Sequence, residues 1–360
     1  MSSGAIPSPE GSESETNDAG DAKGGGGNSC SETLLSALAP SVSIERLRQR
    51  GRLLRCVREF FEQRGVLEVE TPLVCSAGVV DAHLDPVEMR LAAGTDAGRY
   101  FLMTSPELCM KRLLAAGSGA IYQLTRAFRD GERGRLHNPE FTILEWYRPW
   151  VDLHGLMDEV EGLVAAVYAA AGRSLTAKFD RHTYQSVFQE SLDVDPLTAS
   201  VGDLALVAAK RDLSPSPGME NAERDAWLNF LLATCIEPTL GVERPVFVSR
   251  YPVSQAALAR VCPDDKRVAD RVELYIDGVE IANGYHELTD PQEQRRRFAV
   301  ANEERRAHGK RELPVDERFL RVLNRLPDCC GIAVGIDRLF LTALGGESLD
   351  DVMAFPIDHV

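Results

Sequence analysis

The segment Val272–Leu288 reads VELYIDGVEIANGYHEL, and its pattern predicts a β-hairpin with a defined register. Asp277–Gly278 separates two runs that are rich in β-branched and aromatic residues. This dipeptide favours a two-residue type I′ turn, because both central residues of such a turn need a positive φ. The turn would place Tyr275 opposite Glu280. The segment therefore predicts antiparallel β-structure in this part of the chain.

Three glutamates, Glu273, Glu280 and Glu287, recur in this hairpin at intervals of seven residues. In a regular register Glu273 opposes Ala282, so Glu273 and Glu280 would be diagonal neighbours roughly 5–8 Å apart on one face. Glu287 would point to the other face unless a bulge, expected at Asn283–Gly284, restores it. Carboxylates this close favour a cation, which indicates a Mg²⁺ site completed by a phosphate. The alternative is a solvated outer face, and the hairpin alone does not exclude it.

The segment Ala127–Arg148, AFRDGERGRLHNPEFTILEWYR, indicates a second hairpin with a long loop. The loop carries arginines, a histidine and an asparagine, and arginine is the side chain best suited to bidentate contact with phosphate. Phe141 begins the returning strand, where its ring could stack on a flat base. By itself, an arginine-rich loop is equally well explained as a solvated turn.

The segment Gly331–Gly345, GIAVGIDRLFLTALG, predicts a strand that leads into a helix. Its glycines at 331 and 335 would allow a ligand or another strand to approach closely. Arg338 opens the helix, and the alternative for it is a structural ion pair at a core strand–helix joint. The sequence has no P-loop and no GxGxxG motif, so nucleotide binding would need a different fold.

Helical periodicity and turn residues place the remaining elements. A strand is expected over Val66–Val74, at a sheet edge because of Pro72. Ser105 is expected to cap a helix that has Pro106 at its first position and ends at Gly117. A helix capped by Ser43 is expected up to Gly65, with an apolar stripe of Leu47, Leu54, Val57 and Phe61. Further helices are expected at Leu153–Ala171, within Tyr184–Leu240 and near Arg338, and further strands at Ala120–Asp130, Phe141–Arg148, Pro245–Arg250, Arg271–Ile276, Val279–Ala282 and Ile332–Val334.

The expected strands occur as neighbouring pairs with short turns, not in regular alternation with helices. We therefore expect a mixed, mainly antiparallel sheet flanked by helices, an α+β architecture. Residues 1–43 are rich in Gly, Ser and acidic side chains, so they are expected to form a disordered tail. A single folded domain would follow over residues 44–360.

Charge and composition exclude several classes of protein. The formal net charge is −15, and the first 43 residues carry six acidic side chains and one lysine. The remainder is therefore still acidic, which counts against a nucleic acid as the main partner. No apolar run approaches the roughly 18 residues of a membrane span, and the N-terminus has no apolar signal core. The eight cysteines form no CxxC pair, as expected for idle thiols in a reducing cytoplasm.

Taken together, these segments resemble the three motifs of class II aminoacyl-tRNA synthetases, in particular the lysyl-type catalytic core. The matching order is a helix and strand with Pro72, then FRDGE and HNPEF, then ELYIDGVEIANGYHEL, and finally GIDR. The resemblance covers about Ser43 to Pro356. It implies that the folded domain is a class II synthetase-like catalytic core.

Within this group the chain resembles the elongation factor P–(R)-β-lysine ligases. Lysyl-tRNA synthetases carry an anticodon-binding domain before the first motif, where this chain has a 43-residue acidic segment. The stretches TSPELCMKRLLAAG and RGRLHNPEFTILEWYRP are close to the ligase sequences. The last motif has Ala333 where tRNA-charging enzymes usually have glycine, a substitution associated with a reshaped amino-acid site.

The resemblance also implies roles for single positions. Arg129 and Arg338 would be catalytic, acting on the α- and γ-phosphates of ATP. Mg²⁺ would be held by Glu273 and Glu280. The ATP-binding residues would be Arg129, Asp130, Gly131, Asn138, Phe141, Glu280, Ile281, Gly335 and Arg338. The substrate amino acid would be bound by Ser105, Pro106, Glu107, Glu145, Tyr147, Glu287 and Ala333.

The implied activity is that of a cytoplasmic, ATP-dependent ligase. It would activate (R)-β-lysine or lysine as an aminoacyl-adenylate and transfer it to a lysine side chain of elongation factor P, as a homodimer without membrane attachment. tRNA is not expected as a partner. Two alternatives stay open: a short lysyl-tRNA synthetase paralogue that charges tRNA, and a non-catalytic paralogue that binds an amino acid.

One position departs from the family pattern. Class II enzymes usually have glutamate two residues after the motif arginine, whereas this chain has Gly131 there and Glu132 next. Which group would meet the adenine amino group therefore stays open, as does the base for amide formation.

Overall fold

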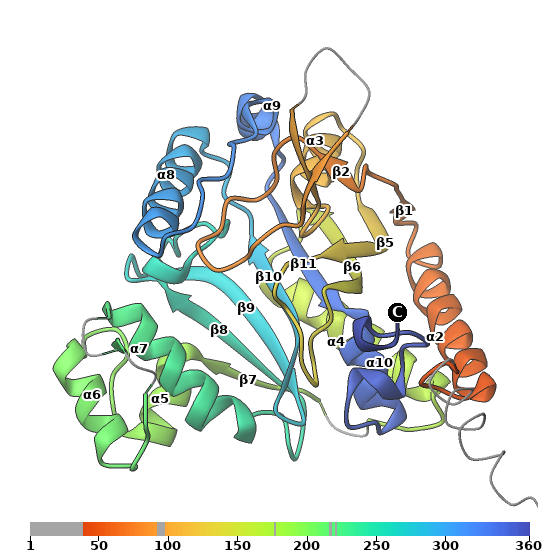
Figure 1. The fold of residues 1–360 in the computed structure, drawn as a ribbon. Helices are drawn as coiled ribbons and strands as arrows, with labels where there is room; N and C mark the ends of the chain where they lie inside the picture. The colour runs from red at the N-terminus through yellow and green to blue at the C-terminus, as the bar shows by residue number, and fades with distance from the viewer. Residues whose placement is uncertain (1–38, 92–97, 176–177, 216–217, 220–221) are drawn as a thin grey trace, which may run out of the picture. The chain divides into compact units, whose positions relative to one another are not determined.

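An eight-stranded sheet, with the strand order β1-β5-β6-β11-β10-β9-β8-β7, forms the frame of the domain in this computed structural model (Figure 1). The edge pairs β1–β5 and β7–β8 are parallel, and the five pairs between them are antiparallel. This confirms the predicted mixed, mainly antiparallel sheet. The strands, in sheet order, are β1 Leu67–Glu68, β5 Ile121–Phe128, β6 Glu140–Pro149, β11 Cys329–Gly335, β10 Val279–His286, β9 Val268–Ile276, β8 Val246–Pro252 and β7 Asp180–Thr183.

Helices lie on both faces of this sheet, and a small second sheet has the order β2-β4-β3. Its strands are β2 Val74–Cys75, β3 Glu88–Arg90 and β4 Arg99–Leu102. The α-helices are α2 Ile44–Glu62, α3 Glu107–Ala115, α4 Leu153–Ala170, α5 Tyr184–Leu192, α6 Val201–Ala209, α7 Arg224–Leu231, α8 Pro291–Ala307, α9 Glu317–Val322 and α10 Ile336–Leu344.

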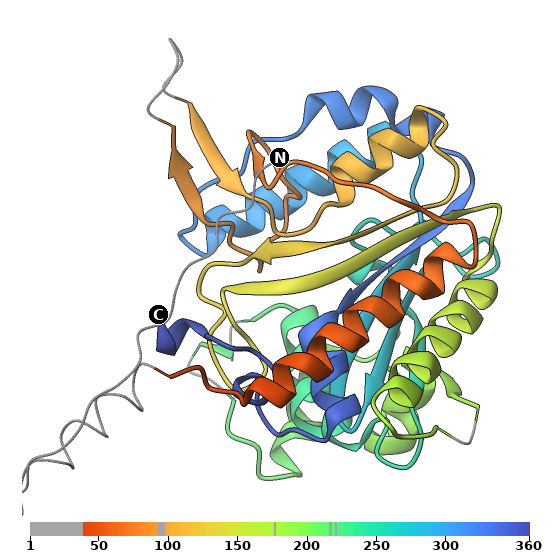
Figure 2. The same ribbon diagram turned by 90° about the vertical axis from the view of Figure 1, so that its right-hand side faces the viewer.

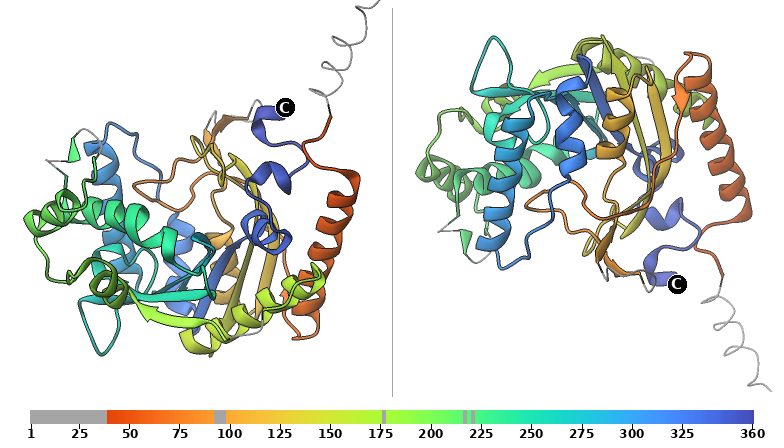
Figure 3. Two further views of the ribbon diagram at one scale, coloured as in Figure 1. Left: turned by 90° about the horizontal axis from the view of Figure 1, so that it is seen from below. Right: turned by 90° about the horizontal axis from the view of Figure 1, so that it is seen from above.

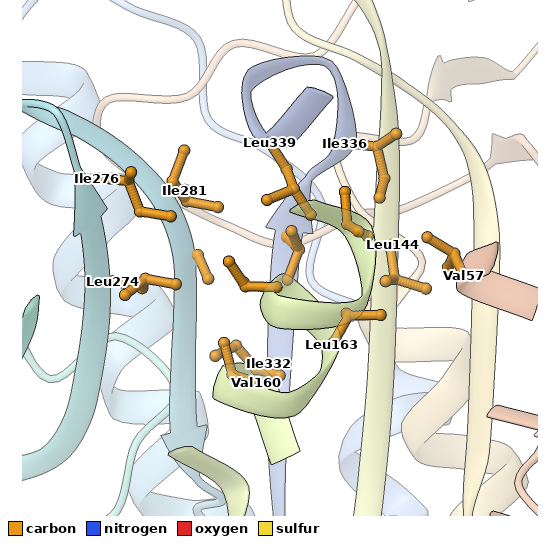
Figure 4. Packing of buried hydrophobic residues seen from close by; sticks show 14 of the residues in the cluster. Val57, Leu144, Val160, Leu163, Leu274, Ile276, Ile281, Ile332, Ile336 and Leu339 are labelled. Atoms are coloured by element: carbon orange, nitrogen blue, oxygen red, sulfur yellow. The ribbon is translucent and has the colours of Figure 1, made fainter. Parts of the chain in front are cut away.

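One face of the sheet is apolar and carries the main core. Helices α2, α4 and α10 cover it, and Figure 2 shows α2 and α4 running across this face. Side chains from α4, such as Val160 and Leu163, meet those of the strands, such as Leu144 and Leu274 (Figure 4). All four are fully buried. We refer to this side as the apolar face.

The other face carries two separate groups of helices, one toward each end of the sheet. Helices α3, α8 and α9 form one apolar cluster with residues of β5, β6 and β11. Helices α5, α6 and α7 form another with residues of β8 and β9. Figure 3 shows the α5–α7 group at the opposite end of the sheet from α2. The residues between the two groups, which we call the polar face, carry the candidate site.

The hairpin predicted from Val272–Leu288 is present as β9 and β10. Asp277 and Gly278 have φ values of 51° and 73°, as a type I′ turn requires, and Tyr275 opposes Glu280 as predicted. The predicted position of the bulge was wrong. The register shifts between Glu280 and Ala282, so that Glu273 opposes Asn283 and not Ala282.

The observed bulge changes the face of Glu287, as a bulge at the predicted position would have done, although it lies earlier in β10. Ile281 and Ala282 both belong to the core of the apolar face, so two consecutive side chains point the same way. From Asn283 onward the side chains alternate again, and Asn283 lies on the face of Glu280. Glu287 consequently lies on the same side as Glu273 and Glu280.

Several predicted boundaries were wrong. The segment Val66–Val74 is not one strand, because β1 and β2 end and begin on either side of Pro72 and belong to different sheets. β1 does lie at a sheet edge. Helix α3 begins at Glu107, with Pro106 at the N-cap, although the Ser105 hydroxyl still accepts a hydrogen bond from the Glu107 amide at 3.4 Å. The buried stripe of α2 comprises Leu53, Val57, Phe60 and Phe61.

The structure describes residues 39–91, 98–175, 178–215, 218–219 and 222–360. All but the last five residues of the tail predicted over residues 1–43 lie outside these ranges. The strands β3, β4 and β7 and the helices α8 and α9 were not predicted. Within the described ranges, no helix is long and apolar enough to cross a membrane.

Candidate active site

A row of side chains across five strands forms the centre of the polar face. Antiparallel pairing aligns Gln123, Glu145, Ala333, Asn283 and Glu273, one from each of β5, β6, β11, β10 and β9. Residues that oppose each other across a ladder share a face, so this row places predicted site residues side by side. Among the described residues, the Glu145 Oε2, Gln123 Oε1 and Asn283 Oδ1 atoms are buried without a hydrogen-bond partner. Three buried acceptor atoms of this row therefore receive no hydrogen bond from the described part of the chain.

Three carboxylates and a lysine form a buried cluster beside this row. The Lys111 ammonium donates to Glu107 Oε1 at 2.6 Å and lies 2.5 Å from Glu287 Oε2. The Tyr147 hydroxyl donates to Glu145 Oε1 at 2.5 Å. All five residues are buried, and the Lys111 side chain is only 1% exposed. We call these residues the carboxylate cluster.

Burial controls the protonation of the carboxylate cluster. It raises the pKa of Glu145 to about 8, with a further rise from the charge of Glu107. Burial also raises the pKa of Glu287 to about 7, against the lowering effect of Lys111. The pKa of Tyr147 is raised well above its ordinary value by burial and by the charges of the three glutamates. A cationic ligand would relieve this accumulation of negative charge.

Gly331 leaves room for the carboxylate cluster. A Cβ atom at this position would lie 2.3 Å from Tyr147 Cε1 and 2.6 Å from Glu287 Oε1. Only glycine therefore fits between these two side chains. Ala333 lies two residues further along the same strand, paired with Glu145 on one side and Asn283 on the other. The structure thus places Ala333 next to the predicted amino-acid site.

The arginine-rich loop joins the end of β5 to the start of β6, whereas Tyr147 of the carboxylate cluster lies toward the other end of these two strands. The Arg129 guanidinium lies 4.9 Å from the centre of the Phe141 ring and forms an ion pair with Glu132 at 3.4 Å. It covers one face of the ring on which adenine was expected to stack, so adenine would need the other face or a displaced Arg129. Gly131 has a φ of 77°, a value at which glutamate would be strained. The departure from the family pattern is therefore linked to the backbone conformation of this loop.

Arg338 lies at the meeting point of three segments. It donates to the backbone carbonyls of Leu136 at 3.1 Å and Glu280 at 3.0 Å, and its Nη2 lies 2.6 Å from His137 Nε2. It also forms an ion pair with the Glu280 carboxylate at 3.5 Å. Burial and the charge of Arg338 lower the pKa of His137. Arg129 and Arg338 are therefore both brought to the loop end of the polar face.

Two predicted ATP-binding residues of this loop are held by the protein itself. The Asp130 amide donates to the Asp85 carbonyl at 2.7 Å. The Asn138 side chain donates to the Glu140 carbonyl at 2.6 Å and accepts from the Ile357 amide at 2.8 Å. Asn138 thus fixes the loop, and a direct contact with ATP is left to its remaining donor.

Further bonds tie this loop to the C-terminal segment. The Leu349 amide donates to the Arg135 carbonyl at 2.9 Å, and the Arg135 side chain donates to the Glu347 carbonyl at 2.6 Å. Arg133 forms an ion pair with Asp358. The shape of the loop therefore depends on residues more than 200 positions away in the sequence.

Two other predicted ATP-binding positions have different geometry. The Ile281 side chain is 2% exposed and packs in the core of the apolar face, so only its backbone could contact a nucleotide. Gly335 is the residue before α10, and a Cβ there would meet only the Arg338 side chain, at 3.7 Å or more.

The two predicted Mg²⁺ ligands are differently placed. Glu273 is buried and accepts bonds from Arg271 at 2.6 Å, Tyr251 at 2.5 Å and Tyr275 at 2.6 Å. The Glu280 side chain is 39% exposed and forms an ion pair with Arg338, so it would contact a ligand from the surface of the site. Burial, followed by the charge of Glu273, raises the pKa of Glu280, so a cation between them would be favoured.

These carboxylates fit Mg²⁺ only in part. Oxygen donors from two carboxylates, completed by phosphates and water, suit Mg²⁺. Within the described ranges, however, no group of three or more His, Cys, Asp or Glu side chains is arranged to hold a metal. The pair therefore provides an incomplete shell that a phosphate-bearing substrate would have to finish.

Sequence reasoning missed several residues of the polar face. Lys111 was not identified, although its spacing of four residues from Glu107 on a helix is a known signal for an ion pair. Arg271 could have been found because it lies two residues before Glu273, on the same face of β9. Glu237 comes from a distant segment, and its carboxylate accepts a hydrogen bond from Tyr275 at 3.2 Å. Nothing in its local sequence indicates this placement.

Comparison with known proteins identifies the family. The profile described as tRNA synthetases class II (D, K and N) matches residues 32–359. The chain belongs to this family. The order of motifs and the mainly antiparallel sheet are thereby those of the class II synthetase catalytic fold, and the family implies the use of ATP.

Several bacterial relatives within this class II family are similar along nearly their whole length. The chain is 49% identical over 322 residues to the "Elongation factor P--(R)-beta-lysine ligase" of Proteus mirabilis (strain HI4320). This alignment covers 88% of the present chain and 97% of the relative. Proteins with the same name from Enterobacter sp. (strain 638) and Salmonella agona (strain SL483) are each 48% identical, with 89% of this chain and 97% of the relative covered.

Proposed function

We propose that this protein is an ATP-dependent ligase that activates (R)-β-lysine, or lysine, as an aminoacyl-adenylate and transfers it to a lysine side chain of elongation factor P. The observation that carries the proposal is the 49% identity to a ligase with this name over 97% of its length. The carboxylate cluster supports it, because three buried carboxylates suit a substrate with two ammonium groups.

In the first half-reaction the two ends of the polar face would bind different substrates. The carboxylate cluster would hold the ammonium groups of the amino acid, and the arginine-rich loop would hold ATP. The amino-acid carboxylate would then attack the α-phosphorus, form a C–O–P bond and release pyrophosphate. Arg129 and Arg338 would stabilise the charge that develops on the phosphates, since positioned cations in a partly buried site do this without reorganisation.

The second half-reaction needs a neutral amine from the protein substrate. The ε-amine of the acceptor lysine would attack the carbonyl carbon of the adenylate, form an amide bond and expel AMP. This amine must lose its proton to become a nucleophile. Glu273 and Glu280 would hold Mg²⁺, which would neutralise phosphate charge when it is bound. We also infer a cytoplasmic homodimer, as the resemblance implies.

Intact-protein mass spectrometry of elongation factor P tests the proposal. The factor is incubated with the enzyme, Mg-ATP and (R)-β-lysine, and parallel reactions supply α-lysine or offer bulk tRNA as the acceptor. We expect a mass gain of one lysyl unit on the factor, larger with the β isomer. Base-labile, ester-linked amino acid on tRNA instead of the factor would make the chain a tRNA-charging paralogue. Amino-acid binding without pyrophosphate exchange would make it a non-catalytic one.

A further inference from the structure

Lys111 is a buried cation inside the site that must bind a cationic substrate. Its ammonium contacts Glu107 and Glu287 at 2.6 and 2.5 Å, and its side chain is 1% exposed. Burial alone would lower the pKa of Lys111, but the charges of the two glutamates outweigh it and the pKa is raised. Lys111 therefore stays charged where a substrate ammonium would experience its repulsion.

The arrangement of oxygens shows what this lysine leaves for the substrate. Lys111 takes Oε1 of Glu107 and Oε2 of Glu287, and Tyr147 takes Oε1 of Glu145. Oε1 of Glu287 lies over Gly331, and Oε2 of Glu145 is buried with no partner in the part of the chain that the structure describes. One oxygen of each carboxylate is thus occupied by the protein, and the other is left for a further donor.

The net charge of the carboxylate cluster also fits a substrate with two ammonium groups. When its three carboxylates are ionised, the single ammonium of Lys111 leaves two negative charges. A diamino acid with two ammonium groups would neutralise both. Without Lys111 the pKa values of Glu145 and Glu287 would rise further, so ionising the three carboxylates for a diamino acid would cost more free energy.

We propose that Lys111 is a positioning residue for amino-acid recognition: it bridges Glu107 and Glu287 and fixes their side chains, so that their other oxygens and that of Glu145 receive the substrate ammonium groups. The inference rests on the proposed function, because it takes a diamino acid as the substrate. Lys111 itself acts on the substrate through the glutamates, not by bonding to it.

Other titratable and charged groups around the cluster do not replace Lys111. Tyr147 and Tyr285 have pKa values raised by burial, so both phenols stay neutral. The Cys329 and Cys330 thiols, whose pKa values burial also raises, are neutral as well. Arg271 is engaged by Glu273. Among the described residues, Lys111 is the cation that contacts these glutamates.

Lys111→Met tests this role, because it removes the charge and keeps a long unbranched side chain. Lys111→Gln keeps a hydrogen-bond donor without the charge, and Lys111→Arg keeps the charge. Lys266→Met is the matched control, since Lys266 is exposed and its ammonium donates to the Cys262 carbonyl at 3.3 Å, away from the carboxylate cluster. Amino-acid-dependent pyrophosphate exchange is measured from pH 6 to 9, with the diamino acid that the wild type activates best.

The expected result is a defect in amino-acid binding that higher pH repairs. Lys111 lowers the pKa of Glu145 and Glu287, so its loss raises both pKa values and keeps these carboxyls protonated to higher pH. At pH 7 we expect the amino-acid KM of Lys111→Met to rise at least about tenfold, with the acidic limb of kcat/KM displaced upward by about one pH unit. The ATP KM and the rate at saturating amino acid should change by only a few-fold. Lys111→Arg should return the acidic limb toward the wild-type position.

Two results would overturn the inference: an unchanged amino-acid KM in Lys111→Met, or a raised KM with the acidic limb in its wild-type place. The second result would mean that Lys111 contributes to the packing of the site and not to the charge of the glutamates. Retention of ATP binding and of the unfolding temperature shows that a variant is folded, and Lys111→Gln replaces Lys111→Met if the latter is not. Transfer to elongation factor P by the wild type is assayed in parallel, so that its absence counts against the proposed function while the exchange data still decide the role of Lys111.

Discussion

The two faces of the same five strands differ in almost every physical property. On the apolar face, residues such as Leu144, Val334 and Leu274 pack under α2, α4 and α10. Their immediate neighbours in sequence, Glu145, Ala333 and Glu273, lie on the polar face. Because side chains alternate along a strand, one residue stabilises the sheet and the next carries the chemistry. Residues that stabilise the fold and residues of the candidate site therefore alternate along each strand.

The difference also appears in how polar atoms are satisfied. The apolar face buries mainly hydrocarbon side chains, with the Tyr168 hydroxyl as an exception, whereas among the described residues of the polar face several carboxylate and amide acceptors such as Glu145 Oε2 are buried without a hydrogen-bond partner. Leaving such atoms unpaired is costly, and ligand binding would offset that cost. Substitutions on the two faces should accordingly affect different measurements.

The largest expected effect concerns the apolar face. Leu163→Ala in α4 should lower the free energy of unfolding by roughly 2–5 kcal/mol, because it leaves a cavity at a fully buried position. Chemical denaturation measures this change. Pyrophosphate exchange per folded molecule should stay at the wild-type value. A large drop in that rate, at a temperature where the variant is folded, would show that the two faces are coupled.

Arg129→Ala should have the opposite signature. We expect adenylate formation to fall on the order of 10²-fold or more, comparable to the loss of one preorganised donor, with little change in the unfolding temperature. Arg126→Ala is the matched control, since Arg126 is exposed on β5, three residues before Arg129, and pairs with Glu140 at 3.5 Å. Adenylation by Arg129→Ala at the wild-type rate would remove Arg129 from the mechanism.

A smaller effect is expected from Gly331→Ala. The new methyl group would overlap Tyr147 and Glu287, which overpacks the carboxylate cluster at a cost on the order of 1–3 kcal/mol. The amino-acid KM should therefore rise about tenfold or more, while the ATP KM stays constant. Steady-state exchange kinetics distinguish the two constants. Equal changes in both would mean that the distortion spreads along the sheet.

The smallest effect, and one of opposite sign, is expected from Gly162→Ala on the apolar face. Gly162 lies inside α4, and a Cβ there would meet Phe60 at an ordinary contact distance of 3.6 Å. Alanine is the better helix former, so stability should rise by up to about 1 kcal/mol. A thermal unfolding series measures this, and destabilisation would show that the packing between α2 and α4 is tighter than the distances indicate.

Local signals in the sequence were sufficient for much of the fold. The Asp277–Gly278 turn needs only its own two residues, and it was predicted with the correct flanking pair. The bulge could not be placed by the same reasoning, because it depends on Ile281 and Ala282 both packing under the helices of the apolar face. Tertiary burial decides its position.

The candidate site shows the same limit. Arg129, Glu145 and Glu287 stand in recognisable motifs, and the structure brings the carboxylates together as expected. Lys111 could have been paired with Glu107 from their spacing on a helix, but its contact with Glu287 joins distant segments. Glu237 becomes part of the polar face only through such a long-range contact, so its placement could not be inferred from neighbours in the sequence.

The bonds between the arginine-rich loop and the C-terminal segment have a consequence for how the protein is made. All eight strands of the main sheet precede residue 336, yet Asn138 and Arg135 are held by residues between 347 and 357. A chain still emerging from the ribosome would have its sheet before it had these bonds. The protein would thus gain the bonds that shape its arginine-rich loop only after all strands of the main sheet have been made, and a bulky insertion next to Ile357 would be expected to disturb this loop before it disturbed the sheet.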